Sequence, residues 1–285
     1  FTVIVILFSF PVILIIERAN FDILIFILMV LLAYSKNRIF NLIILVFTTI
    51  SKFYPIALAI IFFFEKNLKK IFINFLIFLT IISLIFFIQN EQMFKIFANK
   101  GQGLAFGIYD FSLIGTLKFF KNSHFLINDT NYSIFISVLL LLIPSAVLFF
   151  KIIKYFSKEK ILNKLDYNFF EDKLYIFSSA IILICYFFSS NFVYREIFFI
   201  GLIPLVLKMK MSNKDQKFFS FYYYFLMFKF LVSTPITYIY MNKIIKSINP
   251  ILLIFKYTMD LYIVSFIAAI FLVFLIRSLN IQKIK

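Results

Sequence analysis

The sequence predicts an all-α fold, a polytopic transmembrane helical bundle of about 8–10 membrane segments that includes a broken or re-entrant hairpin. Of the 285 residues, 63% are hydrophobic, and the mean hydropathy is +1.01. A soluble domain of this length could not bury so much apolar surface in one core. Apolar runs near or above ~18 residues, long enough to cross a bilayer, recur along the chain. We therefore expect one transmembrane domain over 1–285.

The apolar runs define the expected spans. Each is bounded by a polar or basic segment, as membrane-crossing helices are. The first run contains Pro11, where we expect a kink. The expected spans cover 1–16, 21–34, 71–88, 133–150, 174–190, 197–207, 218–238 and 251–276.

The stretch 39–64 is too long for one ordinary span and is interrupted at 51–55, which reads Ser-Lys-Phe-Tyr-Pro. Each half, at about 10–12 residues, is too short to cross ~30 Å of hydrocarbon. Basic segments flank both halves, at 36–38 and 65–70. We therefore expect a re-entrant or broken-helix hairpin, whose irregular backbone must face protein or a water-filled cavity.

Counting positive charges gives the expected orientation. One set of connections includes the basic loop 151–173 and holds 18 Lys and Arg in all. The other set includes the long loop 89–132, with an amphipathic helix expected around 104–120, and holds 8. The positive-inside rule makes the first set cytoplasmic. The motifs around 17–22 and 52–55 are then expected at the outer face.

Composition excludes several classes of function. The net charge of +16 could suggest nucleic-acid binding, but the positive residues lie in short loops between spans, so we expect no nucleic-acid partner. His124 is the only histidine, so a His-based metal site or catalytic triad is not expected. Cys185 is the only cysteine, which leaves no internal disulfide. We expect no cofactor, and the sequence leaves a divalent metal ion undecided.

Polar residues between the first two spans are the first candidate site. Arg18 could bind an anionic lipid phosphate or pair with a carboxylate. Glu17 or Asp22 could accept hydrogen bonds from sugar hydroxyls, with Asn20 beside them. The alternative is an ordinary polar collar in which Arg18 reaches the lipid headgroups.

Two further motifs interrupt apolar runs. Lys52 could contact a phosphate as a point charge, with Tyr54 beside it, or could belong to an interfacial turn. Tyr194 and Arg195 follow a span and could bind substrate or lie in the aromatic belt. Ionisable residues also fall inside expected spans, and two of them are spaced to neutralise one another on one helix face. These residues are Lys229, Lys256 and Asp260.

Taken together in this order, the motifs at 17–22 and 52–55 resemble those of the family 87 polytopic glycosyltransferases, which are membrane enzymes of the C-type fold. The stretches 103–107 and 191–195 are similar to further parts of such proteins, although Val193 stands where an Asp is often found. The resemblance covers roughly 17–205, and each motif is short.

The resemblance implies a sugar transferase of a bacterial plasma membrane. Its donor would be a polyprenyl-phosphate-linked sugar, hexose- or mannose-like, and the acceptor would be glycosylated at the non-cytoplasmic face. Arg18, Asn20, Lys52, Tyr54, Tyr194 and Arg195 would bind substrate.

The general base of such enzymes lies in the first outer loop, which is expected upstream of Phe1. Among the residues present, Asp22 and Glu17 are the second choice for this role. Two alternatives stay open: a transporter or flippase of a lipid-linked or anionic substrate, and a non-catalytic membrane assembly subunit.

Overall fold

The computed structural model describes residues 2–17, 20–65, 67–91, 111, 113, 142–155, 169–188, 193–211, 216–241 and 249–283. All regular secondary structure in these ranges is helical, as expected. The expected amphipathic helix at 104–120 and most of the loops 89–132 and 151–173 lie outside the described residues. The helices are α1 (Thr2–Leu7), α2 (Phe10–Glu17), α3 (Asp22–Tyr34), α4 (Arg38–Ser51), η1 (Tyr54–Phe64), α5 (Leu68–Ile88), a helix at 142–155, α9 (Phe170–Phe188), η4 (Val193–Leu202), α10 (Ile203–Lys210), α11 (Gln216–Met241) and α12 (Asn249–Lys283).

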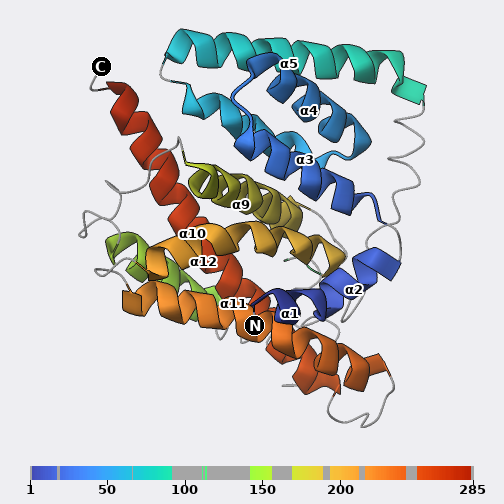
Figure 1. Cartoon of the computed structure of the whole chain (residues 1–285), viewed down its shortest axis with the longest axis vertical. Helices are drawn as coiled ribbons and strands as arrows, with labels where there is room; N and C mark the ends of the chain where they lie inside the picture. Colours follow the sequence, from blue (N-terminus) through green and yellow to red (C-terminus); the bar gives the residue numbers. More distant parts are fainter. Residues whose placement is uncertain are drawn as a thin grey trace, which may run out of the picture.

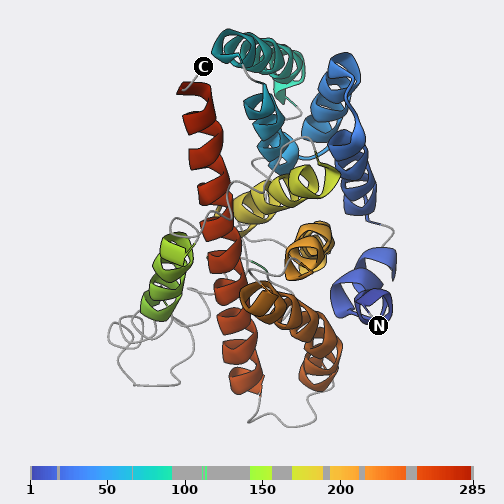
Figure 2. The same ribbon diagram turned by 60° about the vertical axis from the view of Figure 1, so that its left-hand side comes forward.

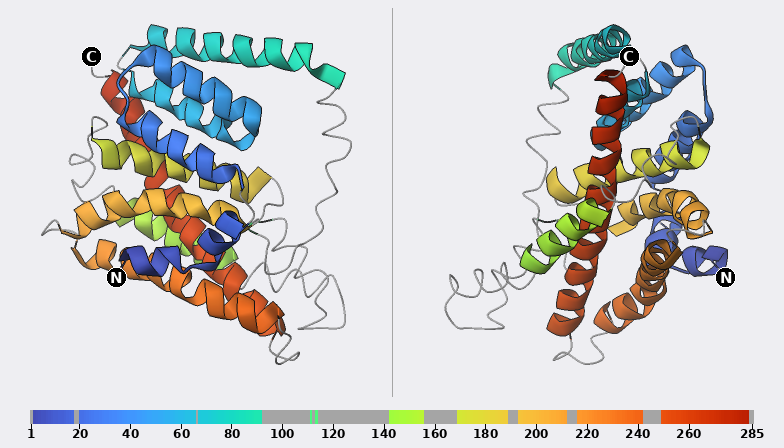
Figure 3. Two further views of the ribbon diagram at one scale, coloured as in Figure 1. Left: turned by 45° about the vertical axis from the view of Figure 1, so that its right-hand side comes forward. Right: turned by 90° about the vertical axis from the view of Figure 1, so that its left-hand side faces the viewer.

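The helices lie side by side in a stack, and α12 crosses it (Figures 1 and 2). Helix α9 lies in the middle and packs against η1, α3, η4, α10 and α12. The helices alternate in direction, so their connections gather at two opposite ends (Figures 1 and 3). We call the end with residues 52–53 the Lys52 end and the end with residues 35–37 the Lys36 end. The starts of α3, η1, η4 and α12 lie at the Lys52 end.

The first apolar run is two helices, which corrects the single kinked span expected over 1–16. Helix α1 ends at Leu7 and α2 begins at Phe10, with Pro11 in its first turn, where a proline is tolerated. The break exposes backbone groups that α11 satisfies. Thr234 Oγ1 donates to the Phe8 carbonyl at 2.8 Å, and Phe10 N donates to Ser233 Oγ at 3.1 Å.

The interruption expected at 51–55 is present. Helix α4 ends at Ser51, Lys52 is extended (φ −153°, ψ 148°), and η1 begins at Tyr54 with Pro55 in its first turn. A proline lacks an amide donor, and its ring clashes with the carbonyl four residues earlier, here that of Ser51, which explains why α4 does not continue through Pro55. Helices α4 and η1 pack against each other as a hairpin.

Several helices begin or end away from the expected positions, among them η4 and α11. Residues 191–196 were expected in a loop, but the 3₁₀-helix η4 starts at Val193 and runs into α10, so Arg195 is a helical residue. Helix α11 continues to Met241, beyond the expected end at 238. Its Pro235 lies inside the helix next to Ser233 and Thr234, the two residues that bind the α1–α2 break.

Two described helices, Lys69–Ile88 and Ile251–Ile276, are long and apolar enough to cross a membrane. Only 22% of the first is buried, and its outward residues are apolar; Phe72, for example, is 67% exposed. A helix that is apolar on all sides and largely exposed is typical of a lipid-facing element. Helices α3, α4 and η1 are apolar but shorter. The structure thus supports a membrane association, whereas the 8–10 spans stay a prediction.

Candidate functional site

Asp22 is the centre of a charge cluster at the Lys52 end. It is the first residue of α3, where a carboxylate interacts favourably with the helix dipole, and it is fully buried. Its Oδ1 accepts from Lys52 Nζ at 2.5 Å and from the Tyr54 hydroxyl at 2.6 Å. Both donors come from the break between α4 and η1. The interruption of that apolar run therefore places a cation and a hydroxyl on one buried carboxylate.

Arg195 approaches Asp22 from a third element, η4. Its Nε lies 3.7 Å from Asp22 Oδ2, and its guanidinium lies over the Tyr54 ring, 4.8 Å from the centroid. At 3.7 Å the two atoms attract as charges but do not form a hydrogen bond. Among the described residues, neither Arg195 Nε nor Asp22 Oδ2 has a hydrogen-bond partner.

Asn20 links the cluster to the start of α3. Its Oδ1 accepts from the Asp22 backbone N and from Lys52 Nζ, both at 3.1 Å. The same amide oxygen therefore fixes the helix start and the ammonium group. Lys52 and Arg195 keep 25% and 18% of their side-chain surface exposed, whereas Asp22 has none.

Among the described residues, the cluster carries two cations and one carboxylate. Both cations keep part of their surface exposed, and two cations held side by side at the edge of a buried site favour an anionic ligand. We refer to Asn20, Asp22, Lys52, Tyr54 and Arg195 as the Asp22 cluster.

The Asp22 cluster contains five of the eight residues that the sequence predicted for a site. Glu17 is exposed at the end of α2, and no described ion pair joins it to the cluster. Arg18 and the Tyr194 side chain lie outside the described residues. Asp22 already accepts two hydrogen bonds from Lys52 and Tyr54, so its geometry suits holding the two cations in place better than removing a proton.

A second charge cluster lies on the other side of η4. Lys229 of α11 donates to Glu196 Oε1 at 3.0 Å and also contacts Asp260 Oδ1. Lys256 pairs with Asp260 Oδ2 at 2.8 Å, which is the i, i+4 pair expected from the sequence. All four side chains are buried, and their charges balance. We refer to these four residues as the Glu196 cluster.

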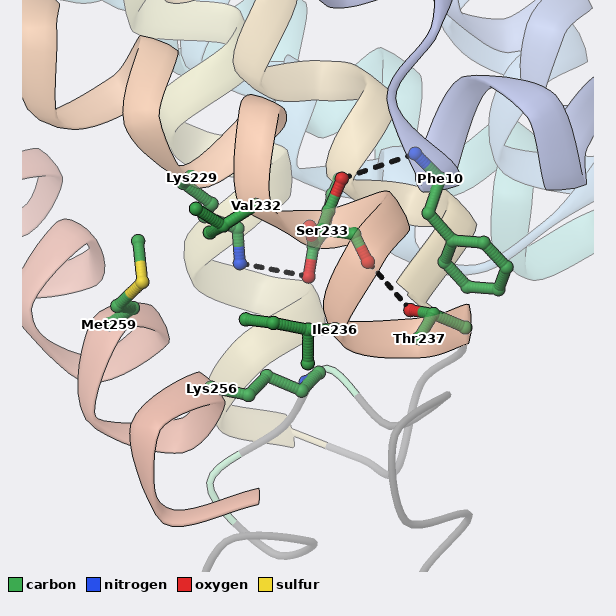
Figure 4. Close-up of a pocket in the computed structure, with 9 residues that line it drawn as sticks. Phe10, Lys229, Val232, Ser233, Ile236, Thr237, Lys256 and Met259 are labelled. Carbon is green, nitrogen blue, oxygen red and sulfur yellow. Dashed lines mark hydrogen bonds and ion pairs between the residues drawn. The ribbon is translucent and has the colours of Figure 1, made fainter. Parts of the chain in front are cut away.

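A pocket of about 30 Å³ opens beside the Glu196 cluster, enough for two or so water molecules. Its polar wall contains Glu196, Lys229 and Lys256, together with hydroxyl groups of α11 (Figure 4). Asp260 does not line the pocket, although it contacts Lys229 as Glu196 does. The complete lining is Phe10, Glu196, Lys229, Val232, Ser233, Ile236, Thr237, Lys256 and Met259.

Sequence reasoning missed Glu196. It was placed in a loop after Tyr194 and Arg195, and its partner Lys229 is 33 residues away, where no spacing rule links them. The one available signal was that Lys229 lies within an apolar span, because a buried lysine requires a carboxylate partner.

Among the described residues, no group of three or more His, Cys, Asp and Glu side chains is placed to hold a metal ion. Comparison with protein-family models, curated proteins and solved structures found no match to this chain.

Proposed function

We propose that the chain is a membrane glycosyltransferase, and that the Asp22 cluster binds the phosphate of a polyprenyl-phosphate-linked sugar donor. The observation that carries the proposal is the convergence of Lys52 and Arg195 on Asp22 at one end of the helix stack, where both cations stay partly exposed. The order of the sequence motifs, which resembles that of family 87 glycosyltransferases, supports the same reaction.

The position of the cluster suits a lipid-linked anion. Helix α5 presents apolar side chains outward and ends at the Lys52 end. A polyprenyl chain would lie along such a surface with its phosphate at the boundary between hydrocarbon and water. The basic connections of the Lys36 end would face the cytoplasm, so the Asp22 cluster would lie toward the outer face of a plasma membrane.

Sugar transfer from a phosphate-linked donor requires positive charge next to the phosphate. When the bond between the sugar and the phosphate breaks, negative charge grows on the leaving phosphate, and fixed cations lower the free energy of that transition state. Lys52 supplies a point charge and Arg195 a planar guanidinium with several donors. Asp22 holds both cations in place before the donor binds.

The test is transfer of radiolabelled sugar from a polyprenyl-phosphate donor to endogenous acceptors, using membranes that contain the protein. We expect Lys52→Ala and Arg195→Ala each to lower transfer by about 10²-fold or more, the effect of removing one group that stabilises transition-state charge. Lys208→Ala is the matched control, because Lys208 pairs with Asp172 at the Lys36 end and should leave transfer unchanged.

Full activity of both variants would rule out the Asp22 cluster as the donor site. Movement of the labelled lipid across proteoliposomes without a new glycosidic bond would instead favour a transporter or flippase. Lys52 and Arg195 meet on Asp22 at one end of the helix stack, and this position suits a reaction at one membrane face.

A further inference from the structure

The pocket beside the Glu196 cluster is lined by a carboxylate, that of Glu196. Glu196 is 1% exposed and lines the pocket, and one of its oxygens accepts from Lys229 at 3.0 Å. The Ser233 hydroxyl donates to the Phe230 carbonyl and the Thr237 hydroxyl to the Ser233 carbonyl. Both hydroxyl protons are therefore used within α11, and the pocket wall is otherwise largely apolar apart from Glu196 and the two lysines. The carboxylate of Glu196 is the group there that can accept a hydrogen bond from the hydroxyl of a ligand.

Glu196 also has a fixed relationship to the proposed donor site. It follows Arg195 directly in η4, and neighbouring side chains of a 3₁₀-helix point about 120° apart because the helix has three residues per turn. Arg195 therefore faces Asp22, and Glu196 faces the pocket. One turn of backbone thus positions a cation in one cluster and a carboxylate in the other.

The other buried carboxylates of the described residues are Asp22, Asp172 and Asp260, and they fit a proton-accepting role less well. Asp22 is held by Lys52 and Tyr54, and Asp260 does not line the pocket. Glu171 and Asp172 lie at the Lys36 end beside Lys208.

We propose that Glu196 is the general base of the transfer reaction and that its pocket receives the acceptor hydroxyl group. This proposal rests on the glycosyltransferase function proposed above. The Glu196 carboxylate takes the proton of the acceptor hydroxyl, whose oxygen forms a bond to the anomeric carbon of the sugar. The bond from that carbon to the phosphate oxygen breaks, and its electron pair leaves with the polyprenyl phosphate. The proton on Glu196 then passes to water.

The experiment compares Glu196→Gln with Asp260→Asn in the sugar-transfer assay. Both substitutions remove one carboxylate from Lys229 and keep the shape of the side chain, but only Glu196 lines the pocket. General-base catalysis contributes about 10²–10⁴-fold, so Glu196→Gln should lower kcat by that factor. Asp260→Asn should change kcat less than tenfold. Thermal unfolding of both variants in detergent shows whether their stabilities match.

A separate binding measurement distinguishes this proposal from the proposed function. Glu196→Gln should still bind polyprenyl phosphate, measured as a shift of the unfolding temperature on adding the lipid, whereas Lys52→Ala should lose that shift. Equal kcat losses in Glu196→Gln and Asp260→Asn would show that Glu196 only stabilises Lys229 and would overturn the assignment. Full sugar transfer by Glu196→Gln would also overturn the assignment of Glu196 as the general base, and would leave the proposed function intact. Absence of transfer by the wild-type protein would overturn both.

Discussion

Arg195 and Glu196 are adjacent in η4, but their side chains belong to two different charge clusters. Arg195 Nε lies 3.7 Å from Asp22 Oδ2, and Glu196 Oε1 accepts from Lys229 Nζ at 3.0 Å. The orientation of η4 about its axis is therefore fixed from both sides. A rotation that improved one contact would break the other, so the two clusters depend on each other through one short helix.

The first prediction concerns the buried carboxylate at the centre of the Asp22 cluster. Asp22→Asn removes the carboxylate that both Lys52 and Arg195 approach, and breaking a buried ion pair in this way costs about 3–5 kcal/mol. We expect the free energy of unfolding in detergent to fall by that order. Glu17→Gln, an exposed carboxylate on α2, is the control and should change it by no more than ~0.5 kcal/mol.

The pairing itself can be measured with a double-mutant cycle. Because Lys52→Met removes the partner of Asp22, Asp22→Asn should cost less in the Lys52→Met background, with an interaction energy of about 1–3 kcal/mol. Additive effects of the two substitutions would contradict the contact between them.

The second prediction concerns the close packing of η4 on α9. A Cβ atom at Gly201 would collide with Ser178 Oγ and lie 3.3 Å from the Met29 methyl group. We expect Gly201→Ala to lower the free energy of unfolding by about 1–3 kcal/mol, as overpacked cores do. Ser178→Ala removes the obstructing oxygen, so the double variant Ser178→Ala, Gly201→Ala should recover most of the loss in thermal unfolding. If the double variant is as unstable as Gly201→Ala alone, the collision is not with Ser178 Oγ.

The third prediction concerns the contact between α11 and the break after α1. Thr234→Val removes the donor to the Phe8 carbonyl, and Ser233→Ala removes the acceptor of Phe10 N. Each should destabilise the protein by about 0.5–2 kcal/mol, the range seen for lost helix caps. Thr258→Val is the matched control, because the hydrogen bond described for Thr258 lies within its own helix, to the Ile254 carbonyl. If Thr258→Val lowers the stability by as much as the other two substitutions, the hydrogen bonds from α11 do not stabilise the break specifically.

The fourth prediction concerns orientation in the membrane. Lys36 and Ser51 are exposed at opposite ends of the helix stack, and Cys185 is buried. In a Cys185→Ala background, Ser51→Cys should react with a membrane-impermeant thiol reagent added outside intact cells. Lys36→Cys should react only after the membrane is opened, because basic connections face the cytoplasm. The reverse pattern would invert the proposed orientation.

The helical fold and most of the Asp22 cluster could be predicted from the sequence because both follow from local signals. Apolar runs gave the helices, and polar residues at their borders, such as Asp22 and Lys52, indicated a site, because charge next to hydrocarbon requires a partner. The Lys256–Asp260 pair was also predictable from its helical spacing.

The remaining features depend on contacts between distant parts of the chain. The pairing of Glu196 with Lys229 joins two helices that no periodicity relates. The start of η4 at Val193 was missed because the polar residues around Arg195 resemble a loop, whereas Asp22 and Lys229 satisfy their charges inside the fold. The end of α1 at Leu7 depends likewise on hydrogen bonds to α11.

The break between α1 and α2 has a consequence for the order of assembly during synthesis. Its hydrogen-bond partners are 223 and 226 positions later in the chain. Residues 2–17 are therefore synthesised long before Ser233 and Thr234, the residues that complete their hydrogen bonds. In a chain truncated before Ser233, the segment 2–17 should consequently stay open to cleavage by proteases.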